Sequence, residues 1–255
     1  LAVLAEGIDI MLTHGQYDEY RDYQSYYCKY QPAPDNAGVH RQGLWTIFGQ
    51  YVPEDKDSPI LDLGCGMGQW LMTLVERGYT AVEGVEISSQ QCQACSDIGL
   101  KVYLVEDTIQ FLVQHEYHYA LITMFDVLEH VPKSIAIDLL CQVQLALRGG
   151  GKFVCTVPNA NSIVGGRWRY NDWTHRTSFT EDSLQYVLLL AGFSNVRVCE
   201  PRVVPRWPWL VRPGLLDWYR RGLLRWIYRN LLYAEIGPQA WHIPLSYNLV
   251  GIGEA

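Results

Sequence analysis

The chain has 255 residues and a hydrophobic content of 49%, which suffices for one large domain or two small ones with a buried core. Its formal net charge of −7 at pH 7 argues against a general nucleic-acid-binding protein, which would carry a basic surface. Seven scattered cysteines, an odd number, indicate reduced thiols in a cytoplasmic protein. No apolar run is long enough to cross a membrane, so no transmembrane segment is expected.

The N-terminal part is expected to form a helical cap over residues 1–52. Six tyrosines stand at three- and four-residue spacings within 16–30, which predicts an amphipathic helix that covers a sheet or acts as a substrate lid. Pro32 and Pro34 end this helix, and residues 40–51 read as a second one.

From residue 58 onward, short apolar runs alternate with helical patterns. Strands are expected at 58–63, 81–87, 102–105, 120–124, 152–157, 194–199 and 246–252. Helices are expected at 69–77, 88–97, from 108, at 133–147 with glycines 149–151 as its stop, and at 181–191. This rhythm predicts an α/β fold, a doubly wound Rossmann-like sheet with helices on both faces. We expect one domain over 1–255, with its core at 58–200, a helical insertion at 201–240 and the last strand within 241–255.

A glycine-rich loop follows the first strand. In the stretch ILDLGCGMG of residues 60–68, glycines permit positive φ and close ligand approach, and the next helix offers free N–H groups. The dinucleotide fingerprint would need glycine at position 69, where Gln69 stands. Asp62 suits the ammonium group of a methionine moiety and would repel a pyrophosphate. The loop therefore favours S-adenosylmethionine (SAM) over a dinucleotide.

Two further acids fit the same ligand. Glu86 ends the second strand, 22 residues beyond Gly64, at the distance from which a carboxylate reaches a ribose diol. Asp107 follows the third strand and is placed to accept a hydrogen bond from the adenine amino group. The predicted cofactor-binding residues are Asp62, Gly64, Cys65, Gly66, Gly68, Glu86, Ile87, Asp107, Thr108 and Met124.

These motifs resemble those of class I SAM-dependent methyltransferases, in particular the broad methyltransferase-domain family that includes ubiquinone-biosynthesis O-methyltransferases and enzymes of polysaccharide gene clusters. The glycine loop at 60–68, Glu86, Asp107 and the string FDVLEHV at 125–131 carry the resemblance, which covers 58–200. It implies a seven-stranded, mostly parallel sheet with the last strand antiparallel. It says much less about the acceptor.

The first candidate catalytic cluster is Asp126, Glu129 and His130, just after the fourth strand. If this segment is helical, the three side chains share one face and form a weak candidate for a divalent metal site. In the resembling ubiquinone O-methyltransferases, a similar string is linked to metal. The alternatives are that His130 is a general base or substrate orienter, or that the cluster is structural.

The second cluster lies between the fifth strand and the next helix, where His175 is the alternative base. Loops at this sheet edge carry function, and indoles can pack on sugars while guanidinium groups bind phosphates. Asp172 and His175 can equally brace the loop. Polysaccharide-cluster relatives look similar around N-D-x-T-H, although many carry an acid where this chain has Arg176. The predicted substrate residues are Arg167, Arg169, Tyr170, Asn171 and Asp172.

A basic aromatic segment precedes the last strand. Seven arginines and a single acid, Asp217, fall within 202–229. Within 205–233, Arg221, Arg225 and Arg229 recur every four residues beside leucines and tryptophans, a pattern that suits peripheral contact with an anionic membrane. The alternatives are packing on the sheet or a homodimer contact.

We therefore expect a cytoplasmic enzyme that uses SAM to O-methylate a sugar, polysaccharide or glycolipid precursor, and that does not bind nucleic acid. A lipophilic quinone-type phenol is the second acceptor class. A non-catalytic SAM-binding subunit is the alternative outside the enzymes.

Overall fold

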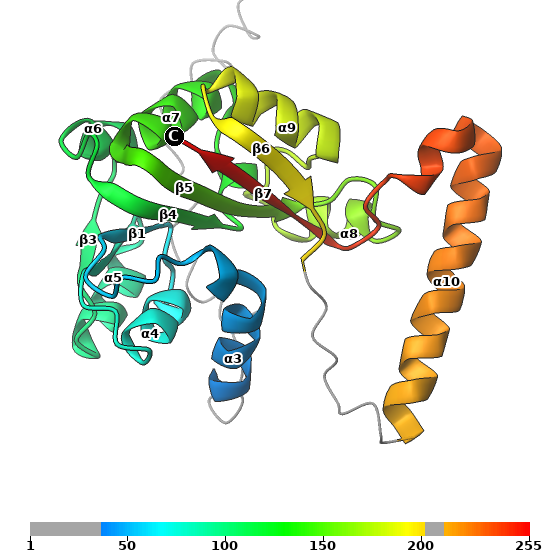
Figure 1. Ribbon diagram of the computed structural model, residues 1–255, viewed down its shortest axis with the longest axis horizontal. Coiled ribbons are helices and arrows are strands. Elements are labelled where there is room, and N and C mark those ends of the chain that lie inside the picture. The colour runs from blue at the N-terminus through cyan, green and yellow to red at the C-terminus, as the bar shows by residue number, and fades with distance from the viewer. Residues whose placement is uncertain (1–36, 202–211) are drawn as a thin grey trace, which may run out of the picture. The chain divides into compact units, whose positions relative to one another are not determined.

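A seven-stranded sheet forms the centre of the computed structural model, which describes residues 37–201 and 212–255. The strand order is β3-β2-β1-β4-β5-β7-β6, and β7 runs antiparallel to both of its neighbours (Figure 1). This confirms the expected mostly parallel sheet with an antiparallel last strand. The strands are β1 Ile60–Leu63, β2 Val82–Glu86, β3 Val102–Leu104, β4 Tyr119–Phe125, β5 Leu147–Pro158, β6 Ser194–Cys199 and β7 Asn248–Glu254.

Helices cover both faces of the sheet, as the strand–helix alternation predicts (Figure 1). Those on one face are α3 Ala37–Phe48, α4 Gln69–Val75 and α5 Ser89–Asp97, and those on the other are α6 Thr108–Val113, α7 Lys133–Ala146 and α9 Glu181–Leu190. Buried side chains of the sheet contribute to an apolar cluster on each face. Ser88 caps α5 by accepting a hydrogen bond from the N–H of Gln91, as expected for this residue type.

Two local expectations are wrong. The glycines at 149–151 do not end α7, which stops at Ala146; they lie inside β5, where the register with β4 shifts. Gly150 takes a φ of +75° at this irregularity, a conformation that glycine adopts without strain. The string after β4 is also no continuous helix, because Asp126 has a φ of +54° and only the short 3-10 turn η4, Leu128–His130, follows.

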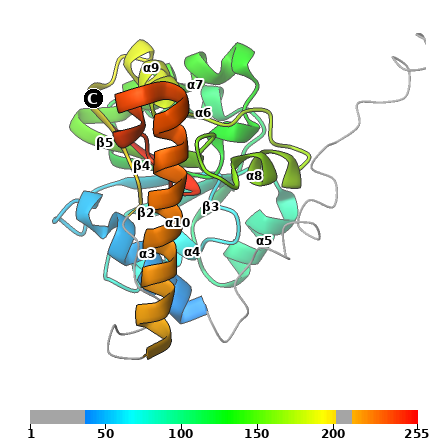
Figure 2. The ribbon, with the colours of Figure 1, turned by 90° about the vertical axis from the view of Figure 1, so that its right-hand side faces the viewer.

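The segment before the last strand contains a long helix, α10 Arg212–Ile236, which leads into the 3-10 turn η5 Gly237–Trp241 (Figure 2). A short helix that the sequence pattern did not predict, α8 Gly165–Asn171, follows β5. A further 3-10 turn, η3 Gly49–Tyr51, follows α3. The predicted helix at 16–30 lies outside the described residues. No helix of the described part is long and apolar enough to cross a membrane.

Candidate functional site

The glycine loop joins β1 to α4 at the carboxyl edge of the sheet. Gly64, Gly66 and Gly68 all have positive φ, between +55° and +69°. A Cβ on Gly64 would lie 2.4 Å from Cγ2 of Val127, and one on Gly68 would lie 2.4 Å from Cδ1 of Leu100. Backbone conformation and packing therefore both require glycine here, which leaves the main chain of the loop open to close approach by a ligand.

Glu86 holds the glycine loop against the end of β2. Its Oε2 accepts a hydrogen bond from the N–H of Gly66 at 2.8 Å, and its Oε1 accepts from the N–H groups of Ile87 and Ser88 at 2.9 Å. Burial raises the pKa of Glu86, and these three donors act in the opposite direction. A carboxylate offers about four lone-pair positions, two on each oxygen. Oε2 accepts from Gly66 and retains capacity for a hydroxyl donor.

Asp62 lies in β1 and is almost fully buried, with 3% of its surface exposed. Its Oδ1 accepts a hydrogen bond from the Thr123 hydroxyl at 2.6 Å. Burial raises the pKa of Asp62 to about 7, the Thr123 bond lowers it, and the nearby charge of Glu86 raises it further. A buried carboxylate of this kind gains stability when a cation binds beside it. This donor set fits the ammonium and ribose of SAM, with Asp62 toward the former and Glu86 toward the latter.

The remaining predicted cofactor residues differ in their surroundings. Cys65 is buried and its thiol lies 4.0 Å from the carbonyl of Gly66, whereas Ile87 is about half exposed. Asp107 caps α6 by accepting a hydrogen bond from the N–H of Gln110 at 3.0 Å, and Thr108 begins that helix. The side chain of Met124 is fully buried in the core.

The two histidine clusters, which are separate in the sequence, form one site. The N–H groups of Arg176 and Thr177 both donate to the carbonyl of Glu129, at 2.8 and 3.1 Å, and so pin the second cluster to the first. As a result the rings of His130 and His175 lie with centroids 4.6 Å apart in an edge-to-face arrangement. Both histidines come from loops at the same sheet edge as the glycine loop, after β4 and β5.

Glu129 lies close to both imidazoles and is 1% exposed. Neither of its carboxyl oxygens has a hydrogen-bond partner, and Oε1 is 3.9 Å from Nε2 of His175. Burial, followed by the charge of Asp126, raises the pKa of Glu129 well above the ordinary range, so the neutral acid is favoured. Burial and the neighbouring His175 lower the pKa of His130 to about 4, so this imidazole is neutral at physiological pH.

Among the described residues, Glu129, His130 and His175 could each offer one metal-ligand atom, all within 4.8 Å of one another. This group differs from the predicted trio, because Asp126 is turned elsewhere. Oδ1 of Asp126 accepts hydrogen bonds from the Thr156 hydroxyl at 2.9 Å and from the Asn248 side chain at 2.8 Å.

The predicted substrate residues lie on α8 and directly after it. Arg169 packs on the ring of Tyr170 and donates to the carbonyl of Arg176 at 2.9 Å. Tyr170 is 80% exposed and Trp173 is 86% exposed, so both present aromatic surface to solvent. Arg167 and Asn171 lie on the same short helix. Asp172, in contrast, is 7% exposed and bonds to Thr174.

The basic segment turns two of its arginines toward the protein. Arg225 pairs with Glu200, and Arg229 donates to the carbonyls of Ala240 and Ile243. Exposed apolar side chains of α10 are Leu223, Leu224, Trp226, Ile227, Leu231, Tyr233 and Ile236. The charge argument for a membrane interface therefore does not include Arg225 and Arg229.

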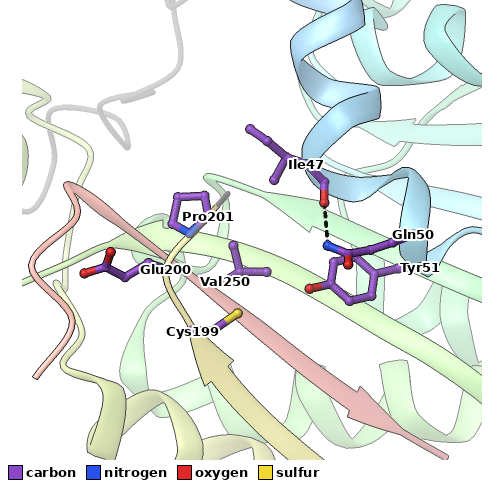
Figure 3. A pocket seen from close by; sticks show the side chains of 7 residues that line it. All are labelled: Ile47, Gln50, Tyr51, Cys199, Glu200, Pro201 and Val250. Atoms are coloured by element: carbon purple, nitrogen blue, oxygen red, sulfur yellow. Dashed lines mark hydrogen bonds between the residues drawn. The ribbon is translucent and has the colours of Figure 1, made fainter. Parts of the chain in front are cut away.

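A cavity of about 190 Å³ lies between η3 and the β6–β7 edge (Figure 3). Its polar groups are largely engaged: the Gln50 amide donates to the carbonyl of Ile47, and Glu200 accepts from Arg225. None of the predicted site residues lines it. The lining residues are Ile47, Gln50, Tyr51, Cys199, Glu200, Pro201 and Val250.

Sequence reasoning missed two features of the site. Phe125, at the end of β4, stacks on Phe48 of α3 with centroids 4.2 Å apart and meets Trp70 of α4 edge-on at 5.7 Å. No sequence signal pairs these distant aromatics. Thr174, which bonds both His130 and Asp172, was also missed. Its signal is the spacing of an Asx turn, an Asp followed two residues later by a hydrogen-bonding Thr.

The doubly wound sheet, the glycine loop and the two strand-end acids together define a SAM-dependent methyltransferase domain. Comparison with known proteins agrees: the chain belongs to the methyltransferase-domain family, whose family model matches residues 38–198. This confirms the predicted class and SAM as the cofactor.

Among relatives, the chain is similar to the ubiquinone biosynthesis O-methyltransferase of Yersinia pestis (strain Pestoides F), with 29% identity over 135 residues. The match covers 44% of this chain and 55% of that protein, so the chain spans about half the length of the curated relatives it matches.

Two solved structures share the fold. A SAM-dependent methyltransferase from Archaeoglobus fulgidus aligns with a TM-score of 0.66 and 18% identity, covering 91% of this chain and 99% of that one. The phosphoethanolamine N-methyltransferase 2 of Haemonchus contortus, in complex with SAM, aligns with a TM-score of 0.54 and 15% identity, covering 84% and 52%.

Proposed function

We propose that this domain transfers the methyl group of SAM to a hydroxyl of a sugar, polysaccharide or glycolipid precursor, with His130 as the general base. The observation that carries the proposal is the convergence of His130 and His175 beside buried Glu129, at the sheet edge that also bears the glycine loop. An imidazole that is neutral at physiological pH has a lone pair available for a hydroxyl proton.

When bound, SAM supplies a methyl group already activated by its sulfonium, so the protein has to align the acceptor and remove its proton. Asp62 and Glu86 would hold the methionine and ribose parts of the cofactor. His130 would take the hydroxyl proton, with His175 as the second candidate for that role. Asp126 is bound to Thr156 and Asn248 and would support the site by fixing the strand ends.

The loop beside the histidines supports a sugar acceptor. Tyr170 and Trp173 are exposed aromatics of the kind that pack on sugar faces, and Arg167 and Arg169 could bind phosphate or carboxylate groups of a glycan precursor. We infer that Asp172, which is buried, orders this loop and does not touch the acceptor.

A quinone-type phenol is the second candidate acceptor. The observation that favours it is the similarity to the ubiquinone biosynthesis O-methyltransferase of Yersinia pestis. A phenol is more acidic than a sugar hydroxyl and would demand less of the base. A non-catalytic SAM-binding subunit is the alternative that requires no acceptor.

The test is a methyl-transfer assay with SAM carrying an isotope-labelled methyl group. Lipid-linked and soluble glycan precursors form one set of acceptors, and hydroxylated quinone precursors form the other. We expect label in a glycan fraction; label only in the phenol would support the second candidate. SAM binding without turnover on either set would favour the non-catalytic subunit.

A further inference from the structure

The hydrogen bonds around Thr174 form a directed chain. Oδ1 of Asp172 accepts from both the N–H of Thr174, at 2.9 Å, and its hydroxyl, at 2.6 Å. Oγ1 of Thr174 in turn lies 2.8 Å from Nδ1 of His130. Thr174 and Asp172 are 4% and 7% exposed, so water does not readily replace either partner.

The direction of this chain fixes the protonation of His130. A threonine hydroxyl has a single proton, and here that proton is donated to Asp172. Oγ1 therefore faces His130 with a lone pair and accepts the proton of Nδ1. A neutral imidazole carries one N–H, so Nε2 is left unprotonated and basic.

His175 reaches the same tautomer by another route. Its Nδ1 lies 2.8 Å from the carbonyl of Trp168, which can only accept, so Nδ1 carries the proton. The carbonyl of Trp168 fixes the tautomer of His175, whereas the hydroxyl of Thr174 contacts Nδ1 of His130, whose ring also bonds the main chain of Thr174. The protein thus contains an internal control for any change at Thr174.

We propose that Thr174 is a positioning residue that, together with Asp172, holds His130 with Nδ1 protonated so that Nε2 is the basic atom. This inference rests on the proposed hydroxyl methylation. In that reaction the acceptor oxygen forms its bond to the methyl carbon while the bond from carbon to sulfur breaks and leaves its electron pair on sulfur. The hydroxyl proton passes to Nε2 of His130 and then to water, and Asp172 stabilises the imidazolium through Thr174.

Replacement of Thr174 separates this role from a purely structural one. Thr174→Val keeps the shape of the side chain and the N–H bond to Asp172, and the loop remains pinned by the bonds of Arg176 and Thr177 to the carbonyl of Glu129. Thr174→Ser retains the hydroxyl and serves as the matched rescue variant. Asp172→Asn keeps an oxygen acceptor for Thr174 but removes the charge.

The first readout needs neither cofactor nor turnover. Long-range proton–nitrogen correlation spectra of the free chain, with isotope-labelled histidine, report which ring nitrogen carries the proton. We expect Nδ1–H for both His130 and His175 in the wild type and in Thr174→Ser. In Thr174→Val we expect His130 to lose the pure Nδ1–H signature while His175 keeps it. An unchanged His130 signature in Thr174→Val would overturn the inference.

The second readout is turnover. We expect Thr174→Val to lower kcat about tenfold or more with unchanged SAM affinity, and Thr174→Ser to restore it. Asp172→Asn should lower kcat while the tautomer signature stays. Equal losses in Thr174→Val and Thr174→Ser would mark a structural role and contradict the inference. If the tautomer changes but transfer proceeds at full rate, His130 is not the base, and the proposed function fails separately from the hydrogen-bond chain.

Discussion

His130 and His175 stand 45 positions apart in the sequence, yet their rings meet at 4.6 Å between centroids. The contact depends on one main-chain oxygen, the carbonyl of Glu129, which accepts hydrogen bonds from two successive N–H groups of the second loop. Two histidine clusters that the sequence presents as alternatives therefore lie together in one candidate site. The site joins a neutral imidazole to a buried carboxyl group beside the cofactor edge.

Replacing His130 tests the base directly. His130→Gln should lower kcat about a hundredfold, the usual contribution of a positioned general base, while the dissociation constant of SAM stays unchanged. Calorimetry and steady-state kinetics give the two quantities. His118→Gln is a matched control, since His118 is exposed and precedes β4 at the opposite edge of the sheet. Equal rates in wild type and His130→Gln would remove His130 from the mechanism.

The pH profile follows from the lowered pKa of His130. The base works only when unprotonated, so the rate falls as pH falls through about 4, well below the ordinary value of 6.5 for histidine. The neutral form is the stable one in the folded protein, so its contribution to stability is present above pH 6.5 and is lost as pH falls toward 4. A profile of kcat against pH at saturating SAM checks this, because bound SAM keeps Asp62 ionised, and an acid limb at 6.5 or above would contradict it.

Glu86 should determine cofactor affinity. Glu86→Gln keeps the shape of the side chain but removes the charge from the bonds to the ribose and to the Gly66 N–H, so SAM binding should weaken by about 2 kcal/mol. Calorimetry with SAM and its demethylated product measures the change. Glu83→Gln is the control on the same strand, because Glu83 bonds Tyr119 and Lys101 instead. Unaltered affinity in Glu86→Gln would refute the ribose assignment.

The raised pKa of Asp62 predicts that the affinity for SAM depends on pH. Its pKa is about 7 in the free protein, and only the ionised form pairs with the ammonium of SAM. Affinity should therefore rise as pH increases from about 6 to about 8, with release of protons on binding. Calorimetry in buffers of different ionisation enthalpy detects that release. Asp62→Asn should bind more weakly and without this dependence, and a flat wild-type profile would argue against the pairing.

Metal removal distinguishes general-base catalysis by His130 from metal binding by Glu129, His130 and His175. If His130 is the base, chelation by EDTA should leave turnover unchanged, because no step requires a cation. Turnover is measured before and after dialysis against the chelator, and again after addition of manganese or magnesium. Activity that disappears with EDTA and returns with the metal would assign these groups to a cation and contradict the role of His130.

Much of the fold follows from local pattern. The strands β1 and β4 are mostly apolar runs, and glycines at 64, 66 and 68 mark the predicted cofactor loop because glycine suits the backbone there. The helix α8 escaped prediction because its residues, GGRWRYN, show no apolar periodicity. The glycines at 149–151 resemble a helix stop but serve a strand irregularity, which depends on the neighbouring strand.

The sequence predicts the members of the candidate site residue by residue but not their arrangement. Glu86 and Asp62 follow from strand ends, since a parallel sheet brings its carboxyl ends to one edge. The meeting of His130 with His175 depends on the path of a long loop, which tertiary bonds to Glu129 decide. Thr174 acquires its role only from that meeting, because its partner His130 lies 44 residues earlier in the chain.

The most direct measurement locates the transferred methyl group. The chain is incubated with SAM carrying an isotope-labelled methyl group and with fractionated glycan precursors, and the product is examined by NMR and mass spectrometry. We expect the label in a methyl ether on a hydroxyl oxygen, in equal amount to the demethylated cofactor, and its loss in His130→Gln. Label on nitrogen, sulfur or carbon, or undiminished transfer by His130→Gln, would contradict hydroxyl methylation with His130 as the base.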